Sequence, residues 1–298
     1  MKEYFMKTAL MTLVCLTMIV LPAYADKNVD ETKPADSDGS VSIEILSGSI
    51  SVIGWDKKEI RVKGTLGDDI ERLDFDVDGN ETEISVKIPD GRGKRDLDAE
   101  LEIHVPLRSS LAIQTISAPI DVENVSGDIE SETVSGSVDI HGNGGTIEVE
   151  TVSGMIGLKG SFENAEAASV SGKIDIAGVS GSVEAATTSG SIIIKDSDLE
   201  RLEMESVSGS VEYSGPIHDS GSYELNSFSG TVRLIMSGNV NASIDLESFS
   251  GSINNDFGQK PEKTSKMTPG SSLSFTMGNG SADISIETFS GSIHLLKG

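Results

Sequence analysis

Seven carboxylates recur at fixed intervals in the middle of the chain, and their spacing points to cation chemistry. One series contains Asp121, Asp139 and Asp175, and the other contains Glu130, Glu148, Glu166 and Glu184. Neighbours within a series are separated by one constant interval or by twice that interval. If one coil of a repeating β structure spans this interval, each series becomes a column with carboxylates about 4.8 Å apart. Stacked like charges destabilise a sheet. We therefore expect the columns either to bind cations or a cationic partner, or to serve solubility and block sheet-to-sheet association.

Other candidate metal sites are incomplete. The stretch from Asp74 to Gly79 resembles the start of a calcium loop, but Ser85 stands where the closing acidic ligand should lie. The glycine-rich segment at His141 lacks the aspartate that calcium-binding repeats need. The histidines His104, His141, His218 and His294 are scattered and have no second ligand at metal spacing. We predict no resident cofactor, with calcium on the carboxylate columns as the alternative.

The sequence offers no recognisable catalytic nucleophile. Ser-Gly pairs recur too often for one serine to be singled out, and no nucleophile elbow is present. The Ser and Thr columns are better explained as hydroxyl ladders between coils. A polysaccharide-active β-helix enzyme would need carboxylates and aromatic residues converging near residues 206–254. We predict that the protein is not an enzyme, and this activity remains the less favoured alternative.

The elements that must position these residues come from an internal repeat. Copies of one motif begin at Thr133, Thr151, Ser169 and Thr187, always at the same interval, and weaker copies begin at Asn124 and Gly178. A nine-residue unit that cannot bury its apolar face alone must stack on its neighbours. The repeat predicts an all-β fold, a parallel β-solenoid with nine-residue strand units, two per coil, and about 18 to 21 residues per coil.

Single columns of the repeat support this fold. The sixth position of the unit is apolar in nine successive copies: Ile120, Ile129, Val138, Ile147, Ile156, Ala165, Ile174, Val183 and Ile192. The eighth position points the same way, as alternation in a strand requires. The fourth position is usually glycine, which permits a bulge, a positive φ or a close contact. Phe228, Phe249 and Phe289 replace valine at the second position and are expected to widen the C-terminal core.

The ends of the chain differ from the repeat. Residues 1–25 have the charge, apolar run and small-residue pattern of a cleavable signal peptide. Residues 26–39 are predicted to be a disordered linker, residues 40–114 an N-terminal β region that caps the solenoid, and residues 115–298 the solenoid itself. A polar insertion is expected at 254–270, followed by an extra coil around Ser272. The chain would then end at Gly298 with an open edge, which allows edge-to-edge self-association.

Composition narrows the partners. The chain has 23 Lys and Arg against 48 Asp and Glu, a net charge of -25. Such a surface repels phosphate backbones and anionic lipid headgroups, so we exclude nucleic acid. The single cysteine, Cys15, lies within the signal segment. The mature chain would therefore lack disulfides, and nothing after Asp26 is apolar enough to span a membrane.

Three features together resemble a known family. They are the stretch SGSISVIGWDKKEIRVKG from Ser47, the stretch DLDAELEIHVP from Asp96, and the series of VSG repeats that follows. They resemble the bacterial family of exported β-strand-repeat proteins labelled "putative adhesin", a domain of unknown function. The resemblance implies an exported β-solenoid, with some members tied to cell-envelope stress. It supplies no catalytic residues.

We therefore expect a non-enzymatic, exported cell-envelope or surface protein whose solenoid is an adhesin-like scaffold for binding or assembly. The carboxylate columns would be its contact surface for an envelope or surface partner. The alternatives are an envelope-stress component that binds cationic peptides or divalent cations, and the polysaccharide-active enzyme. The periplasm, the cell surface and the medium are equally compatible with the sequence.

Overall fold

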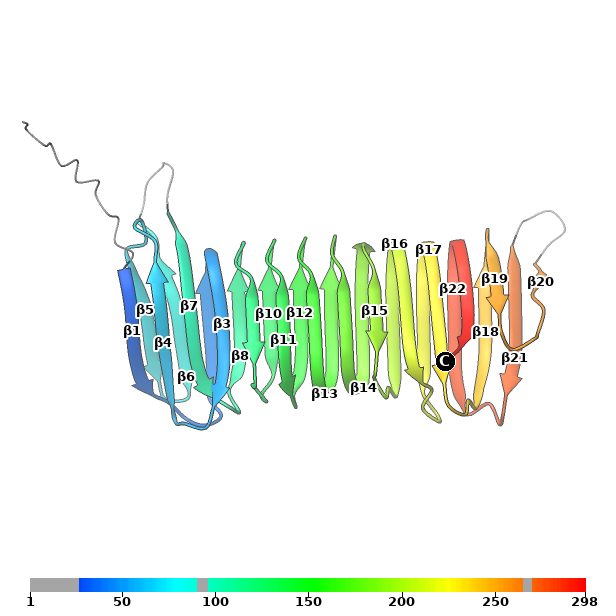
Figure 1. Ribbon diagram of the computed structural model, residues 1–298, viewed down its shortest axis with the longest axis horizontal. Helices are drawn as coiled ribbons and strands as arrows, with labels where there is room; N and C mark the ends of the chain where they lie inside the picture. Colours follow the sequence, from blue (N-terminus) through cyan, green and yellow to red (C-terminus); the bar gives the residue numbers. More distant parts are fainter. Residues whose placement is uncertain (1–26, 90–95, 265–269) are drawn as a thin grey trace, which may run out of the picture.

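The computed structural model describes residues 27–89, 96–264 and 270–298, which form one elongated row of strands (Figure 1). Twenty-two strands are present in these residues, and no helix is. The N-terminal strands are β1 (Lys27–Pro34), β2 (Ser40–Ile45), β3 (Ser47–Trp55), β4 (Glu59–Leu66), β5 (Arg72–Asp78), β6 (Glu81–Lys87) and β7 (Asp98–Pro106). The predicted signal peptide at 1–25 lies outside the described residues.

The remaining strands follow in chain order. They are β8 (Ser110–Thr115), β9 (Ile120–Glu123), β10 (Ile129–Thr133), β11 (Val138–Asn143), β12 (Thr146–Thr151), β13 (Ile156–Ser169), β14 (Ile174–Ser189) and β15 (Ile192–Lys195). The last seven are β16 (Arg201–Pro216), β17 (Ser222–Ser237), β18 (Ala242–Ser248), β19 (Ser252–Asn255), β20 (Glu262–Lys263), β21 (Ser271–Met277) and β22 (Ala282–Lys297).

The strands pair coil to coil in two parallel stacks. In the first stack β8, β10, β12 and the C-terminal half of β13 follow one another, and Ile129 pairs with Ile147. In the second stack β9, β11 and the N-terminal half of β13 do the same, and Val138 pairs with Ile156. The longer strands β14, β16, β17 and β22 contribute one half to each stack. The chain therefore winds as a two-sided β-solenoid.

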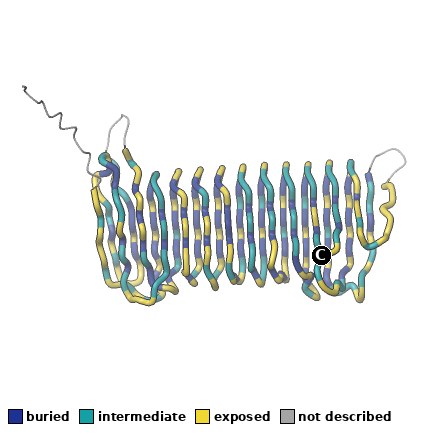
Figure 2. The backbone as a smooth tube through the Cα atoms, in the orientation of Figure 1, coloured by how far each residue is buried: buried dark blue, intermediate teal, exposed yellow. Residues whose placement is uncertain are grey.

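The core lies between the two stacks. Buried and exposed residues alternate along the strands in the middle of the molecule (Figure 2), which is the pattern expected when one face of a strand is packed. Ile129, Val138, Ile140, Ile147 and Val149 are each buried. Because every strand in the middle of the molecule has a neighbour on both sides, backbone pairing and aliphatic packing hold the coils together without any disulfide.

The regular spacing of the fourth-position glycines is explained by close contact between coils. A Cβ atom on Gly172 would lie 1.9 Å from the carbonyl oxygen of Gly154, and one on Gly154 would lie 1.7 Å from that of Gly136. Neither Gly154 nor Gly172 has a positive φ. Of the three roles that the sequence permits, close contact is therefore the one that these positions use.

The prediction of a disordered linker at 26–39 is wrong for residues 27–34. These residues form β1, which pairs antiparallel with β4 over its whole length, from Lys27 opposite Leu66 to Pro34 opposite Glu59. The Arg61 guanidinium donates to both carboxylate oxygens of Asp30 at 2.8 Å. β1 lies at the far edge of the stack and is exposed on most of its length, so its residues are mostly polar. Its sequence therefore lacks the apolar alternation by which a strand is recognised.

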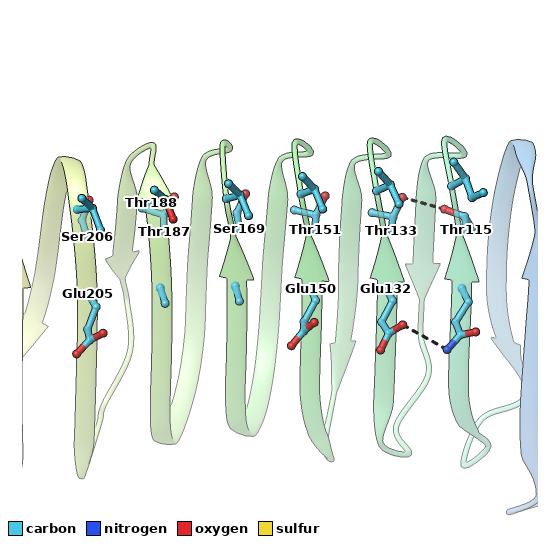
Figure 3. Close-up of a pocket in the computed structure, with 18 of the residues that line it drawn as sticks. Thr115, Glu132, Thr133, Glu150, Thr151, Ser169, Thr187, Thr188, Glu205 and Ser206 are labelled. Atoms are coloured by element: carbon cyan, nitrogen blue, oxygen red, sulfur yellow. Dashed lines mark hydrogen bonds between the residues drawn. The ribbon is translucent and has the colours of Figure 1, made fainter.

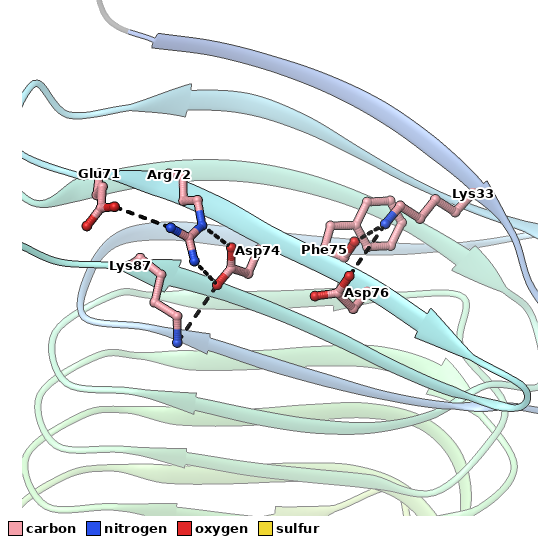
Figure 4. Close-up of polar contacts among 7 residues, drawn as sticks. All are labelled: Lys33, Glu71, Arg72, Asp74, Phe75, Asp76 and Lys87. Atoms are coloured by element: carbon pink, nitrogen blue, oxygen red, sulfur yellow. Dashed lines mark hydrogen bonds and ion pairs between the residues drawn. The ribbon is translucent and has the colours of Figure 1, made fainter.

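Charged side chains join the outermost N-terminal strands (Figure 4). Lys33 of β1 donates to the carbonyl of Phe75, lies over its ring, and pairs with Asp76. On β5, Arg72 pairs with Asp74 at 2.6 Å. The molecule therefore ends in two strands, β1 and β5, that are each paired along one edge and carry charged side chains, which discourages pairing with another chain.

The order of coils at the N-terminal end differs from their order in the sequence. β2 pairs in parallel with both β6 and β8, and β3 pairs in parallel with both β7 and β9. Residues 40–55 thus form a solenoid coil between two coils that come later in the chain. The predicted boundary at 114/115 is wrong as a structural border, because residues 40–55 and β8 already belong to the stacks.

The C-terminal end repeats this exchange of order. β22 lies between β17 on one side and β18 and β19 on the other, and pairs in parallel with all three. Figure 1 shows β22, coloured red, beside the yellow β17. The expected open edge at Gly298 is therefore wrong, since β22 is an interior coil.

Two further expectations for this end need correction. The extra coil expected around Ser272 is instead β21, which runs antiparallel to β18. The polar insertion expected at 254–270 begins inside β19 and contains β20, which pairs with β21, while residues 265–269 lie outside the described residues. The antiparallel strands β20 and β21 close the first stack at this end.

Candidate functional site

The four predicted glutamates form a continuous column on the outer face of the first stack. Glu130 pairs with Glu148, Glu148 with Glu166, and Glu166 with Glu184. The column continues to Glu203 and Glu224, which the sequence analysis missed. It missed them because the coils lengthen after residue 187, so the constant interval of the repeat no longer holds.

Crowding in this column affects the acid strength of its members. The pKa of Glu166 is raised, first by burial of its carboxylate and then by the negative charges of Glu184, Glu148 and Glu150. A raised pKa means that the folded protein disfavours the ionised form. The column therefore carries an electrostatic cost that a positively charged partner would relieve.

The three predicted aspartates lie on the second stack but do not form one column of charge. Asp121 pairs with Asp139, whereas Gly157 separates Asp139 from Asp175. The pKa of Asp121 is raised by burial and by Glu123 and Asp139, and His141 opposes this. Burial acts in the same direction on Asp175, but the hydrogen bond from Lys173 and the charge of Lys195 outweigh it, so the pKa of Asp175 is lowered.

A second carboxylate column lies two residues further along the first stack and was not predicted. Its acidic members are Glu44, Glu132, Glu150, Glu205, Glu287 and Glu247. Gln114, Ala168, Ala186 and Asn226 occupy the same column. Gln114 donates to Glu132 at 3.3 Å. The alanines interrupt the acidic pattern in the sequence, which explains why the repeat did not reveal the column.

An exposed apolar column follows at the corner where each coil leaves the first stack. Its members are Ile116, Val134, Val152, Val170, Val207, Phe228, Phe289 and Phe249, with Thr188 in the same place on one coil. Val134 is 48% exposed and Phe228 is 58% exposed. This line of side chains, which we call the corner column, contains eight of the ten exposed large hydrophobic residues in the part of the chain that the structure describes.

The expectation that Phe228, Phe249 and Phe289 widen the core is wrong. Their side chains are exposed, and the ring of Phe289 stacks between the other two with centroids 4.8 Å apart on each side. Alternation carried forward from the inward sixth and eighth positions places the next unit's first position inward and its second position outward. The phenylalanines stand at that second position, so alternation places them outside, although the same rule fails at the other corner of the coil.

The two corners of a coil are not equivalent. Val125 and Val179 stand at the same repeat position as Val134 and Val152, but they are 1% exposed. The second corner therefore turns its apolar residue inward, whereas the first turns it out to solvent. Burying these side chains is favourable, so an apolar residue kept outside on coil after coil makes this corner a candidate contact surface.

The corner column and the second carboxylate column border one groove along the first stack. It has a volume of about 1320 Å³ and extends from β6 and β2 to β18 and β22. Figure 3 shows part of it, with Glu132, Glu150 and Glu205 on their strands and the Thr and Ser column at the strand ends. Among the described residues that line it, Lys87 is the basic one.

A column of Thr and Ser hydroxyls lies between these two borders, and some of the hydroxyls bond to one another or to the backbone. Thr115 donates to Thr133 at 2.9 Å, and Thr133 accepts from the backbone N–H of Gly136 at 3.0 Å. Thr151 accepts from Gly154 in the same way. The predicted hydroxyl ladder is therefore direct at Thr115 and Thr133, and Thr151 satisfies the turn at its corner. Further along the column several hydroxyls are buried without a hydrogen-bond partner: Ser169, Thr187, Ser206, Ser227 and Thr288.

Two features are absent from the part of the chain that the structure describes. No cluster of three or more His, Cys, Asp or Glu side chains there could hold a metal ion. No helix there has the length and apolarity to cross a membrane.

The fold is a two-sided β-solenoid with antiparallel strands at both ends. One of its faces carries a groove that is bordered by carboxylates on one side and by apolar side chains on the other. The chain belongs to the Toastrack DUF4097 family, whose model matches residues 50–296. No curated protein matches the chain.

Solved structures similar to the chain have low identity to it. A Bacteroides fragilis protein described as a putative adhesin is 13% identical, with a TM-score of 0.46, and the match covers 92% of this chain and 99% of that one. A Clostridium sporogenes protein described as a putative cell adhesion protein is 10% identical, with a TM-score of 0.22 and coverage of 91% and 100%. A Parabacteroides distasonis protein described as a putative lipid binding protein is 9% identical, with a TM-score of 0.29 and coverage of 90% and 96%. The family assignment therefore rests on the family model.

Proposed function

We propose that this protein is an exported, non-enzymatic, adhesin-like scaffold of the cell envelope or cell surface, and that the groove on its first stack is the binding face. The observation that carries this proposal is the corner column, which keeps apolar side chains in solvent along most of the solenoid. Export rests on the sequence pattern of residues 1–25.

The repetition of the groove supports a binding role rather than catalysis. The same residue types recur coil after coil, so the groove offers one long contact surface instead of a single reaction centre. The three phenylalanines stack on one another, which covers ring faces that a sugar would need. We also retain the nine-residue unit as an interpretation, with two inequivalent units in each coil.

Attachment of cells tests the proposal. A deletion strain would be complemented with the native chain, with Val134→Ser/Val152→Ser/Phe228→Ser, or with Met155→Ser. Met155 is 54% exposed but does not line the groove, so it is a matched apolar control. We expect the native chain and the control to restore attachment to a solid or cellular surface, and the groove variant to restore less than a third of it.

Two results would contradict the proposal. One is full attachment by the groove variant, which would show that attachment does not need the groove. The other is recovery of the chain in the cytosolic fraction, which would show that the protein is not exported. Equal amounts of folded protein in all strains, checked by limited proteolysis, make the comparison valid.

A further inference from the structure

We propose that the groove binds a basic amphipathic α-helix that lies along the axis of the solenoid. Its apolar residues would contact the corner column, and its Lys or Arg side chains would face the second carboxylate column. This inference deepens the proposed function, because it names the class of partner that the same groove accepts. Backbone pairing, charge and spacing each support it.

The backbone of the solenoid is already used between coils. At the corner, the N–H of Ser135 donates to the carbonyl of Ile116 at 2.9 Å, and that of Ser153 donates to Val134 at 3.0 Å. Glu132 and Glu150 lie on strands paired on both sides. The groove therefore offers side chains and no free ladder of backbone groups. A helix suits such a surface, because it satisfies its own backbone hydrogen bonds.

The charges of the groove remain available to a partner. Glu132, Glu150, Glu205, Glu247 and Glu287 form no ion pair within the described residues, whose ion pairs involve other carboxylates.

On the second stack two carboxylates already have a cation beside them. Asp175 there pairs with Lys173 at 2.8 Å, and Glu212 pairs with Arg233 at 3.8 Å. A basic partner would thus find uncompensated carboxylates beside the corner column on the first stack, and complementary charge sets both orientation and rate of association.

The spacing of the two columns matches one face of a helix. Residues two apart on a strand lie about 7 Å from each other, and successive coils lie about 4.8 Å apart. A helix rises about 5.4 Å per turn, so one apolar residue per turn meets the corner column at nearly every coil. Flanking basic residues would reach the carboxylates, as in other complexes in which an amphipathic helix lies in a groove.

The test uses a designed 21-residue helix of leucine and lysine, added to the mature full-length chain and followed by calorimetry and circular dichroism. One control peptide has the same composition in a shuffled order without an amphipathic face, and another has glutamate in place of lysine. We expect the amphipathic basic peptide to bind at least tenfold more tightly than either control and to gain helix on binding.

Matched variants locate the binding. Val134→Ser/Val152→Ser and Glu132→Gln/Glu150→Gln are each expected to weaken binding at least tenfold. Met155→Ser, and Asp121→Asn/Asp139→Asn on the second stack, should change it less than twofold. All four positions in the groove pairs are solvent-exposed, so the variants should fold, and unchanged thermal transitions would verify this.

Four outcomes would overturn the inference. Equal binding of the shuffled peptide would show general electrostatic attraction. If Asp121→Asn/Asp139→Asn weakened peptide binding as much as the groove variants, the binding would depend on the overall negative charge of the protein and not on the groove. If the peptide did not bind but the groove still governed cell attachment, the helical partner would be ruled out and the proposed function would stand. If the peptide did not bind and the groove variant also attached fully, both the helical partner and the proposed function would be ruled out.

Discussion

At the scale of single residues, the glutamate column of the first stack combines structural cost with functional potential. Glu166 lies between Glu148 and Glu184, and its pKa is raised. A carboxyl group whose folded pKa lies above its unfolded value stabilises the fold in acid and loses that contribution as the pH rises through the folded pKa. At neutral pH the ionised column therefore lowers the free energy of unfolding.

Replacing Glu166 with Gln should raise stability at pH 7. Like charges directly opposite each other cost roughly 0.2–1 kcal/mol per pair, so we expect a gain of about 0.5 kcal/mol in the free energy of unfolding. Urea titration at pH 7 and at pH 4 would measure it, and the gain should vanish at the lower pH. Asp175→Asn is the matched control and should destabilise, because it removes the partner of Lys173. A gain from Glu166→Gln that persists in acid would contradict this account.

The glycine stack gives a second prediction for single residues. Gly172→Ala would place a Cβ atom 1.9 Å from the carbonyl oxygen of Gly154, so adjacent coils would have to separate. We expect a loss of about 1–3 kcal/mol, the usual range for overpacking. In Gly157→Ala the nearest atom is the flexible carboxylate of Asp139 at 2.4 Å, and the loss should be below about 1 kcal/mol. Equal losses would mean that the close contact does not set the cost.

The sequence predicted the glutamate column correctly where the coils are regular, but not where they become longer. The constant interval of the repeat placed Glu130, Glu148, Glu166 and Glu184 next to one another, because the register of the first stack follows that interval. It could not include Glu203, since a longer coil changes the interval and only the three-dimensional pairing restores the column.

At the scale of elements, both ends of the solenoid hold a coil out of sequence order. β2 and β3 are inserted at one end, and β22 is inserted at the other. Repeat copies have nearly the same shape, so β17 could accept either β18 or β22 as its neighbour on local pattern alone. The sequence therefore identified the coils but not their order, which depends on the antiparallel strands at each end.

Hydrogen exchange distinguishes the two possible orders at the C-terminal end. As an interior coil, β22 should exchange as slowly as β17 at its central amides, from Ile284 to Leu295, because both its edges are paired. A terminal coil with a free edge would instead fray and exchange at least tenfold faster than β17. Fast exchange across the whole of β22 would thus contradict the observed order.

At the scale of the whole molecule, an elongated rod carries a net charge of -25. The glutamates of the groove have no ion pair among the described residues, whereas cations accompany Asp175 and Glu212 on the second stack and Glu203 on the first. Screening of like charges should therefore stabilise the fold, since the Debye length falls from about 10 Å at 0.1 M salt to about 3 Å at 1 M.

We expect the melting temperature to rise by several degrees between 0.02 M and 0.5 M sodium chloride. The quadruple variant Glu130→Gln/Glu148→Gln/Glu166→Gln/Glu184→Gln should lose about half of this dependence. Differential scanning calorimetry would measure both proteins. An unchanged dependence in the variant would show that the column is not the main source of the repulsion.

Photo-cross-linking tests most directly the claim that the groove is the binding face. The basic amphipathic peptide would carry a benzophenone on its apolar face, and cross-linked residues of the mature chain would be mapped by mass spectrometry. We predict cross-links at the corner column, at residues such as Val134, Val152, Val207 and Phe228, with few on the second stack. Cross-links spread over both stacks, or concentrated at the capped ends, would contradict the account.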